Sequence, residues 1–200
     1  MTETAPQAAP TSMAEKVVPA VSLAITASLV AVVVGTYLVG RTTSPHHMTV
    51  GVVELGAPPA EVLGLLQDME RRPDWRPDVT QIARKSDPTD DREVWRELDD
   101  EDDRFDFQVT GRPHDGVVLR TDAPEQIGYE ATWTFQVAPG EGGGSRVTVT
   151  EEGFIDNPLF RGLFWLRDGP EETVRDELTW LGLAVDGSAP TIDELVVEER

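Results

Sequence analysis

The stretch Tyr129–Val137 (YEATWTFQV) decides the fold class of this chain. Aromatic or aliphatic residues occupy every odd position from Tyr129 to Val137, and polar residues occupy every even position. Because successive side chains of a strand point to opposite faces, this alternation predicts a strand with one buried face and one solvated face. A sheet with one dry face needs a second layer to cover it.

Further strands are expected on both sides of this stretch. Phe105 and Phe107 alternate with Asp106 and Gln108 in the same way. The predicted strands cover residues 47–55, 79–85, 92–98, 104–112, 116–121, 129–137 and 146–155. Turn-forming clusters rich in Gly, Pro and Asp separate most of them, so consecutive strands are expected to pair as hairpins. The sequence therefore predicts an α+β fold with an antiparallel sheet of about seven strands.

Two helices are expected to supply the covering layer. A short amphipathic helix begins at Pro59, and a long one begins at Asn157-Pro158, where a capping residue precedes a first-turn proline. Pro170 is expected to kink or break the long helix. The segment 187–190 ends it, which leaves residues 187–200 as an acidic C-terminal tail with apolar positions of its own.

The N-terminal part has a different composition. Residues 1–14 are rich in Ala, Pro, Ser and Thr and are expected to be a disordered tail. The next segment, Val17–Gly40, carries no charge, and as a helix its 24 residues would span about 36 Å, against about 30 Å for the hydrocarbon core of a bilayer. Residues 15–41 are therefore predicted to be one transmembrane helix, which makes this a single-pass membrane protein.

The side of the membrane on which the domain lies is less constrained. Lys16 and Arg41 flank the apolar segment with one basic residue each, so the positive-inside comparison is a tie. A short N-terminal segment followed by a helix and a large C-terminal domain is the layout of a signal anchor, which favours a domain outside the cytoplasm.

Charge and cysteine content exclude several classes of function. The chain of 200 residues holds 17 Lys and Arg against 37 Asp and Glu, for a net charge of −20. A nucleic-acid partner is not expected, because phosphate binding needs a basic surface. The chain contains no cysteine, which removes disulfides, cysteine-ligated metals and thiol nucleophiles.

Short motifs in a fixed order resemble one protein superfamily, the START-like superfamily, also called SRPBCC, which includes the polyketide cyclase/dehydrase group. Residues 57–62 resemble its "APPEEVW" opening of the first helix, and residues 68–77 resemble its "D-x-E-x-x-P-x-W-x-P" segment. Residues 132–135 and 144–151 resemble its last two strands, and residues 157–160 resemble the start of its final helix. The likeness covers residues 46–186.

This resemblance implies a helix-grip fold, in which a curved antiparallel sheet wraps around a long C-terminal helix and leaves an elongated cavity. Members of the superfamily bind or carry lipids, sterols, polyketides or other apolar molecules, and a few are enzymes. The chain departs from the pattern at Leu63, where an aromatic residue is usual, and at Pro170, where many relatives continue the helix.

No metal or cofactor site is expected. His46 and His47 are adjacent, so in a strand they point to opposite faces, and His114 stands alone in a turn. The acidic run 99–103 lacks the glycine and the final glutamate of a calcium loop and is interpreted as a solvated hairpin tip. No serine of the domain lies in a nucleophile motif.

Glu151 and Arg120 are the catalytic candidates. Glu151 shares the strand face of Val147 and Val149, so burial among apolar groups would raise its pKa and make it an acid or base. The alternatives are that Glu151 pairs with an arginine such as Arg120 or lies at the solvated end of the sheet. Arg120 could hold the anionic head of a ligand or occupy an ordinary surface position.

Aromatic residues are the candidates for ligand binding. In a partly hollow core, the side chains of the two clearest strands would line the ligand site, and those outside the strands could form a gate or dip into the membrane surface. Ordinary packing remains the alternative for all of them. The predicted ligand-binding residues are Trp75, Phe105, Phe107, Trp133, Phe135, Phe160 and Phe164.

Three functions follow, in decreasing order of preference. The first is a membrane-anchored binding or carrier domain for a hydrophobic small molecule or lipid. The second is an enzyme of the polyketide cyclase/dehydratase type, and the third is a partner-binding module that uses the acidic surface and residues 195–197. The sequence identifies neither the ligand nor a protein partner.

Overall fold

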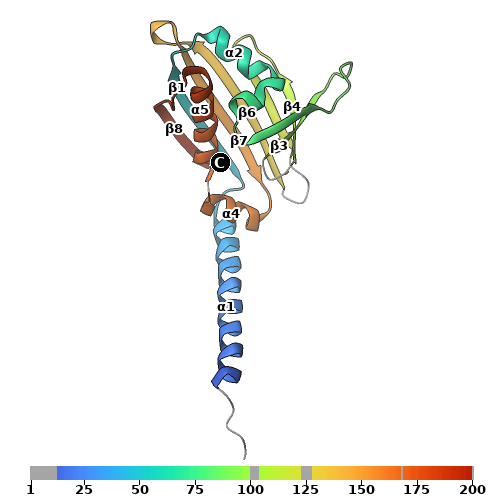
Figure 1. Cartoon of the computed structure of the whole chain (residues 1–200), viewed down its shortest axis with the longest axis vertical. Coiled ribbons are helices and arrows are strands. Elements are labelled where there is room, and N and C mark those ends of the chain that lie inside the picture. Colours follow the sequence, from blue (N-terminus) through green and yellow to red (C-terminus); the bar gives the residue numbers. More distant parts are fainter. Residues whose placement is uncertain (1–12, 100–103, 123–127, 168, 200) are drawn as a thin grey trace, which may run out of the picture.

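The computed structural model describes residues 13–99, 104–122, 128–167 and 169–199, and the predicted tail 1–14 therefore lies almost entirely outside the described residues. Its main feature is an antiparallel sheet of eight strands in the order β2-β3-β4-β5-β6-β7-β1-β8 (Figure 1). The strands are β1 (His46–Leu55), β2 (Val79–Arg84), β3 (Glu93–Asp99), β4 (Arg104–Gly111), β5 (Gly116–Asp122), β6 (Tyr129–Pro139), β7 (Ser145–Ile155) and β8 (Ile192–Glu199).

Helices cover one face of this sheet, as the helix-grip prediction requires. The helices are α1 (Met13–Thr42), α2 (Pro59–Gln67), α3 (Arg72–Trp75), α4 (Pro158–Arg167) and α5 (Gly169–Asp186), with short 3-10 turns at Met69–Arg71 and Glu141–Gly143. The core lies between the sheet and the pair α2 and α5, where Val53, Val62, Val147 and Leu181 are fully buried. This layering confirms the predicted α+β architecture.

The register of β6 and β7 confirms which side chains face the core. Trp133 lies opposite Glu151 and Phe135 opposite Val149. All four are buried, whereas Gln136 is exposed. The alternation noted in Tyr129–Val137 therefore does divide a covered face from a solvated one.

The C-terminal segment is the main departure from the sequence-based expectation. Residues 187–200 were expected to be a tail, but Ile192–Glu199 forms β8 and pairs antiparallel with β1, with Val50 opposite Val196. Leu195 packs against the core, while the acidic side chains at 193, 194, 198 and 199 are exposed. The sheet gains an eighth strand because β1 would otherwise present unpaired backbone groups at its edge.

The final helix is broken where the proline predicted a break. Asn157 Oδ1 accepts the backbone N–H of Leu159 at 2.9 Å and so caps the start of α4. Gly169 adopts a left-handed φ of 69° and is followed by Pro170 in the first turn of α5. A left-handed residue suits glycine, and proline at a helix start loses no hydrogen bond, so the chain changes direction here.

Helix α1 projects from the sheet domain, and α4 lies between them (Figure 1). Its window Ile25–Thr42 is the one helical segment among the described residues that is long and apolar enough to cross a bilayer, and almost none of it is buried in the protein. By length and composition, such a helix is that of a membrane anchor or of a signal sequence.

Candidate functional site

A cavity of about 480 Å³ lies between the sheet, α3 and the first turns of α5. Several of its lining residues lie at or next to an end of their strands, namely Val79, Asp99, Phe105, Thr121 and Tyr129. Arg167 of α4 and Thr173 of α5 line it as well. The cavity therefore lies at the end of the domain that faces α4 and the N-terminal helix, which we call the proximal end.

Four of the predicted aromatic residues line this cavity. They are Phe105, Phe107, Trp133 and Phe135, contributed by two non-adjacent strands, β4 and β6. The Trp133 and Phe135 rings stack at a centroid distance of 6.4 Å. Together they give the cavity an apolar wall.

The other three predicted residues lie outside the cavity lining. Trp75 is buried behind it, edge-on to Phe135 at 6.4 Å between ring centroids. Phe160 and Phe164 belong to α4: Phe160 is exposed, and the Phe164 ring lies 5.6 Å from the imidazole of His47. The seven predicted residues are thus divided between the cavity wall, the packed core behind it (Trp75) and helix α4 at the junction with α1.

A cluster of charged side chains, which we call the ionic wall, lines the cavity beside these aromatic residues. Arg72 of α3 donates to Glu97 of β3, and the Arg72 guanidinium lies 5.0 Å from the centre of the Phe107 ring. Arg76 reaches Glu177 of α5 at 3.0 Å and Asp78 at 2.6 Å. Glu97 of β3 lies opposite Phe105 of β4 in the sheet register, so paired charges and aromatic rings lie side by side in the lining of the cavity.

Burial and charge act in opposite directions on the pKa values of this cluster. Burial lowers the pKa of Arg76, but the charges of Glu177 and Glu97 more than offset it and hold the pKa above its ordinary value. Burial raises the pKa of Glu177, and the nearby charge of Arg76 offsets this only in part. Arg76 is thus permanently cationic, whereas ionisation of Glu177 is disfavoured.

Glu151 is fully buried on the inner face of β7, as its position in the strand predicted. Tyr129, which lines the cavity, donates its phenolic proton to Glu151 Oε1 at 2.8 Å. The same oxygen lies 3.6 Å from Nε2 of the buried His47. Burial and the charge of Glu151 raise the pKa of the Tyr129 phenol well above its ordinary value. Tyr129 is therefore a neutral hydroxyl at the cavity wall with a buried carboxylate behind it.

Several polar atoms in this region have no hydrogen-bond partner among the described residues. They include Nε2 of His47, Oγ1 of Thr49 and Oε2 of Glu151, which belong to the adjacent strands β1 and β7. Oε2 of Glu177, at the ionic wall of the cavity, is a further case. Buried unpaired polar atoms are rare and costly, so their gathering at one end of the domain marks it as more than a packed core.

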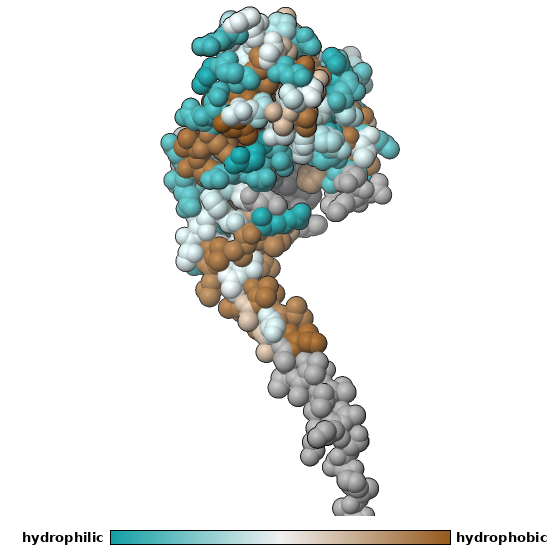
Figure 2. Space-filling view, turned by 60° about the vertical axis from the view of Figure 1, so that its left-hand side comes forward, coloured by the Kyte–Doolittle hydropathy of each residue, from teal (hydrophilic) through white to brown (hydrophobic). Residues whose placement is uncertain are grey.

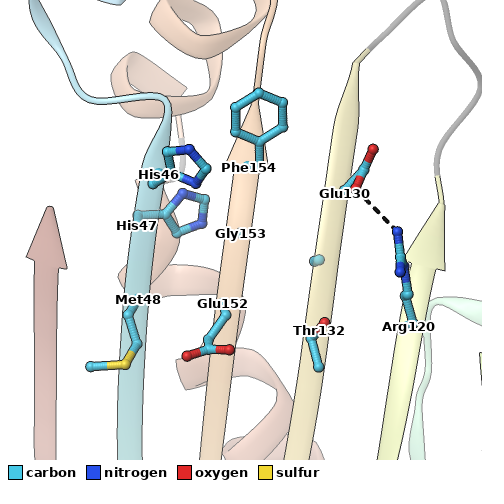
Figure 3. Close-up of a pocket in the computed structure, with 10 residues that line it drawn as sticks. His46, His47, Met48, Arg120, Glu130, Thr132, Glu152, Gly153 and Phe154 are labelled. Atoms are coloured by element: carbon cyan, nitrogen blue, oxygen red, sulfur yellow. Dashed lines mark hydrogen bonds and ion pairs between the residues drawn. The ribbon is translucent and has the colours of Figure 1, made fainter. Parts of the chain in front are cut away.

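Arg120 lies on the other face of the sheet, away from Glu151. It sits opposite Thr132 and donates to Glu130 at 3.3 Å (Figure 3). Both residues line an outer hollow of about 400 Å³ with His46, Glu152 and Phe154. The expected alternative, in which Glu151 pairs with Arg120, is therefore wrong, because neighbouring positions of a pleated strand face opposite sides. The structure does not bring the two catalytic candidates together.

The sequence reasoning missed the ionic wall, the phenol and His47. Signals for some of them were present: Glu177 lies between Val174 and Leu178 on the buried stripe of α5, and Glu97 follows Trp95 at a two-residue interval in β3. Tyr129 shares the strand face of Trp133. Among the described residues, no group of three or more His, Asp or Glu could hold a metal ion.

Solved structures similar to this chain show that its fold is START-like. A START superfamily protein from Mycobacterium smegmatis matches with a TM-score of 0.54 at 16% identity over 70% of this chain and 98% of that one. The lipid transfer and protein localization domain of human StarD13 matches with a TM-score of 0.50 at 15% identity, over 69% and 76% of the two chains. The di-domain ARO/CYC protein BexL of the BE-7585A biosynthetic pathway matches with a TM-score of 0.54 at 12% identity over 74% of this chain. This chain spans about half, 52%, of the length of BexL.

Residues 46–180 match the family "Polyketide cyclase / dehydrase and lipid transport". The chain belongs to this family, and the resemblance noted in its motifs is confirmed. A search of curated proteins gave no match. The structural matches, at these low identities, establish the fold and leave the activity to the site itself.

Proposed function

We propose that the protein is a membrane-anchored domain that binds or carries a hydrophobic small molecule or lipid in the cavity between the sheet and α5. The observation that carries this proposal is the cavity of about 480 Å³ with its aromatic wall. Its volume falls within the range of about 300–1,000 Å³ that small-molecule sites occupy. An interior filled by side chains would have left no room for such a ligand.

The composition of the cavity walls supports an amphipathic ligand. Phe105, Phe107 and Trp133 would contact the apolar body, and the cluster of Arg72, Arg76 and Glu177 would meet a polar group. The family description includes lipid transport, and the human StarD13 domain is described as a lipid transfer domain. Both are consistent with a carrier.

The anchor in this proposal is α1. Its segment Ile25–Thr42 has the length and composition to cross a bilayer, and a tethered carrier would keep its cavity beside the phase in which apolar ligands dissolve. We further propose that the domain lies outside the cytoplasm, as in a signal-anchor protein. A reporter that is active only in the cytoplasm, fused to the C-terminus, is expected to stay inactive, and activity would reverse this orientation.

Photocrosslinking in a bilayer tests the carrier. The full-length protein is reconstituted in phosphatidylcholine liposomes that contain a diazirine-bearing fatty acid, irradiated, digested and analysed by mass spectrometry. We expect crosslinks on peptides that contain Phe105, Phe107 or Trp133, in addition to those on α1. Leu119→Trp, which places an indole at the cavity wall, is expected to remove the cavity crosslinks.

Two internal controls make this result interpretable. Crosslinks on α1 report that the anchor meets the lipid and are expected to be unaffected by Leu119→Trp. Leu183→Trp adds the same side chain at an exposed position of α5 and is expected to leave the cavity crosslinks unchanged. Crosslinks confined to α1 in the wild-type protein would contradict the carrier.

A cyclase/dehydratase-like enzyme is the second candidate, and the Tyr129–Glu151 pair favours it. A phenol at the cavity wall backed by a buried carboxylate can exchange a proton with a bound carbonyl compound. Arg120 would take no part, because it lies on the outer face. Incubation of a bound polyketide-type ligand with wild-type protein would show loss of water by mass spectrometry, and Tyr129→Phe would abolish the loss while retaining binding. Unchanged ligand in both samples would leave the carrier as the function.

A further inference from the structure

We infer that α4 is a membrane-contact helix that lies in the headgroup region of the bilayer crossed by α1. This inference rests on the proposed anchor and adds a second, separate contact with the lipid. Four large apolar side chains of α4 are exposed: Leu159 (39%), Phe160 (40%), Leu163 (52%) and Leu166 (59%). Their spacing places them on one side of the helix.

The opposite side of α4 is fixed against the end of α1. A Cβ atom at Gly40 would overlap the backbone oxygen of Pro158, and one at Gly162 would overlap the backbone oxygen of Thr36. Both positions therefore require glycine for the two helix backbones to approach this closely. The exposed apolar side of α4 cannot be turned inward without separating this contact.

Arg161 of α4 connects α1 and the sheet domain through hydrogen bonds. Its side chain is buried, and Nε donates to the backbone oxygen of Gly40 at 2.6 Å. Nη1 donates to the backbone oxygen of Ile155, at the end of β7, at 2.5 Å. One guanidinium thus ties together α1, α4 and the sheet, and sets the depth of α4 along α1.

This depth places α4 at the bilayer surface. Gly162 meets Thr36, which lies five residues before Arg41, the first charge after the apolar segment, and this corresponds to about 7.5 Å of helix. Interfacial helices bury their apolar side about 5–10 Å into the boundary between headgroups and acyl chains. With Arg41 in the headgroup layer, the contact of α4 with Thr36 lies about 7.5 Å deeper, within this range.

The exposed apolar side of α4 is suited to contact with a lipid surface rather than with a protein. Apolar surface at the foot of the domain continues onto the described part of α1, where Val34 and Leu38 are exposed (Figure 2). Any bilayer that covers α1 up to Arg41 would also reach α4. Arg167, at the end of α4, lines the cavity, so this docking would set the cavity beside the membrane surface.

Single-cysteine labelling tests the inference, because the chain has no cysteine of its own. Leu38→Cys on α1, Leu163→Cys on α4 and Leu183→Cys on α5 are made in the full-length protein, labelled with an environment-sensitive nitrobenzoxadiazole probe and placed in phosphatidylcholine liposomes. All three positions are exposed in the protein. We expect the probes at 38 and 163 to emit at shorter wavelength and to be quenched by lipid with a doxyl group near the headgroup. The probe at 183 is expected to be quenched by aqueous iodide instead.

The outcomes separate this inference from the proposed anchor. If the probe at 38 is quenched by lipid and the probe at 163 behaves like that at 183, α4 does not touch the bilayer and the inference is wrong, while the anchor stands. If the probe at 38 is not quenched by lipid, the anchor itself fails. A probe at 163 that is shielded from both quenchers would mean that a second copy or another protein covers α4, which also overturns the lipid contact.

Discussion

The two ends of the same sheet carry opposite kinds of interior. At the end far from α1, α2 packs on β5, β6 and β7, and α5 packs on β1 and β7. Apolar side chains between these layers, such as Val53, Leu66 and Leu181, are almost fully buried. At the proximal end, the sheet, α3 and the first turns of α5 surround a cavity, the ionic wall and the Tyr129–Glu151 pair. Hydrophobic burial stabilises the fold, whereas buried charges contribute little net stability. The far end therefore holds the fold together and leaves the proximal end free to be hollow and polar.

Breaking the ionic wall should have the largest effect on stability. Glu97→Ala leaves the buried Arg72 without its carboxylate and also removes a partner of Arg76. Because an unpaired buried charge is strongly unfavourable, we expect the free energy of unfolding to fall by about 3–5 kcal/mol. Urea unfolding of the full-length protein in detergent micelles, followed by tryptophan emission, measures this change.

The control for this prediction is a solvated pair on the neighbouring strand. Asp106→Ala removes the partner of Arg96, with which it pairs in a partly exposed position. Such pairs contribute about 0–1 kcal/mol, so little change is expected. Equal losses in the two variants would mean that the cluster around Glu97 is as well solvated as the surface, which would remove the contrast between the ends of the sheet.

The same substitution at the two ends sharpens the comparison. Leu181→Ala removes a fully buried side chain from the far core and is expected to cost about 2–5 kcal/mol of unfolding free energy. Leu119→Ala, at the cavity wall, is expected to cost less, because a side chain that already borders empty volume loses fewer packing contacts. The yield of lipid crosslinks in the cavity, relative to that of the wild-type protein, should change for Leu119→Ala and not for Leu181→Ala. Equal stability losses would show that the cavity wall is packed as tightly as the core.

Most of the fold could be predicted from local sequence patterns, and the exception is strand β8. The alternation in Tyr129–Val137 fixed which face is covered, and Asn157-Pro158 with Pro170 predicted the start and the break of the last helix. Residues 192–199 gave no comparable signal. Their pairing with β1 shifts register between Val52 and Val53, so the apolar positions Ile192, Leu195 and Val197 do not alternate regularly.

The site could be predicted from the sequence only where the alternation of side chains along a strand shows which face of the sheet a residue occupies. This alternation placed the side chains of Phe107, Trp133 and Glu151 on the covered face of the sheet, and all three are buried there. The alternation did not decide between the two interpretations of Arg120, because the unbroken apolar run Val117-Val118-Leu119 does not show which face is covered. The ionic wall joins Arg72, Glu97 and Glu177 from α3, β3 and α5, and no local pattern relates residues so far apart in sequence.

The smallest predicted effect is a pH dependence that belongs to the proximal end alone. Burial raises the pKa of Glu177 in the folded protein above its ordinary value of 4.5. The folded carboxyl therefore holds its proton more tightly than the unfolded chain does. The resulting stability is fully present below the unfolded pKa and is lost as the pH rises through the folded pKa.

Glu177→Gln isolates this contribution, because glutamine resembles the protonated acid and does not titrate. We expect the difference in unfolding free energy, wild type minus variant, to fall as the pH rises above about 4.5 and then to level off, by about 1.4 kcal/mol for each unit of pKa shift. Urea unfolding of both proteins across this pH range measures the difference. Glu172→Gln, at an exposed position of the same helix, should give a flat difference. A difference that rises with pH for Glu177→Gln would mean that Arg76 stabilises the carboxylate more than burial disfavours it, and that the ionic wall of the cavity is a stabilising element like the far core.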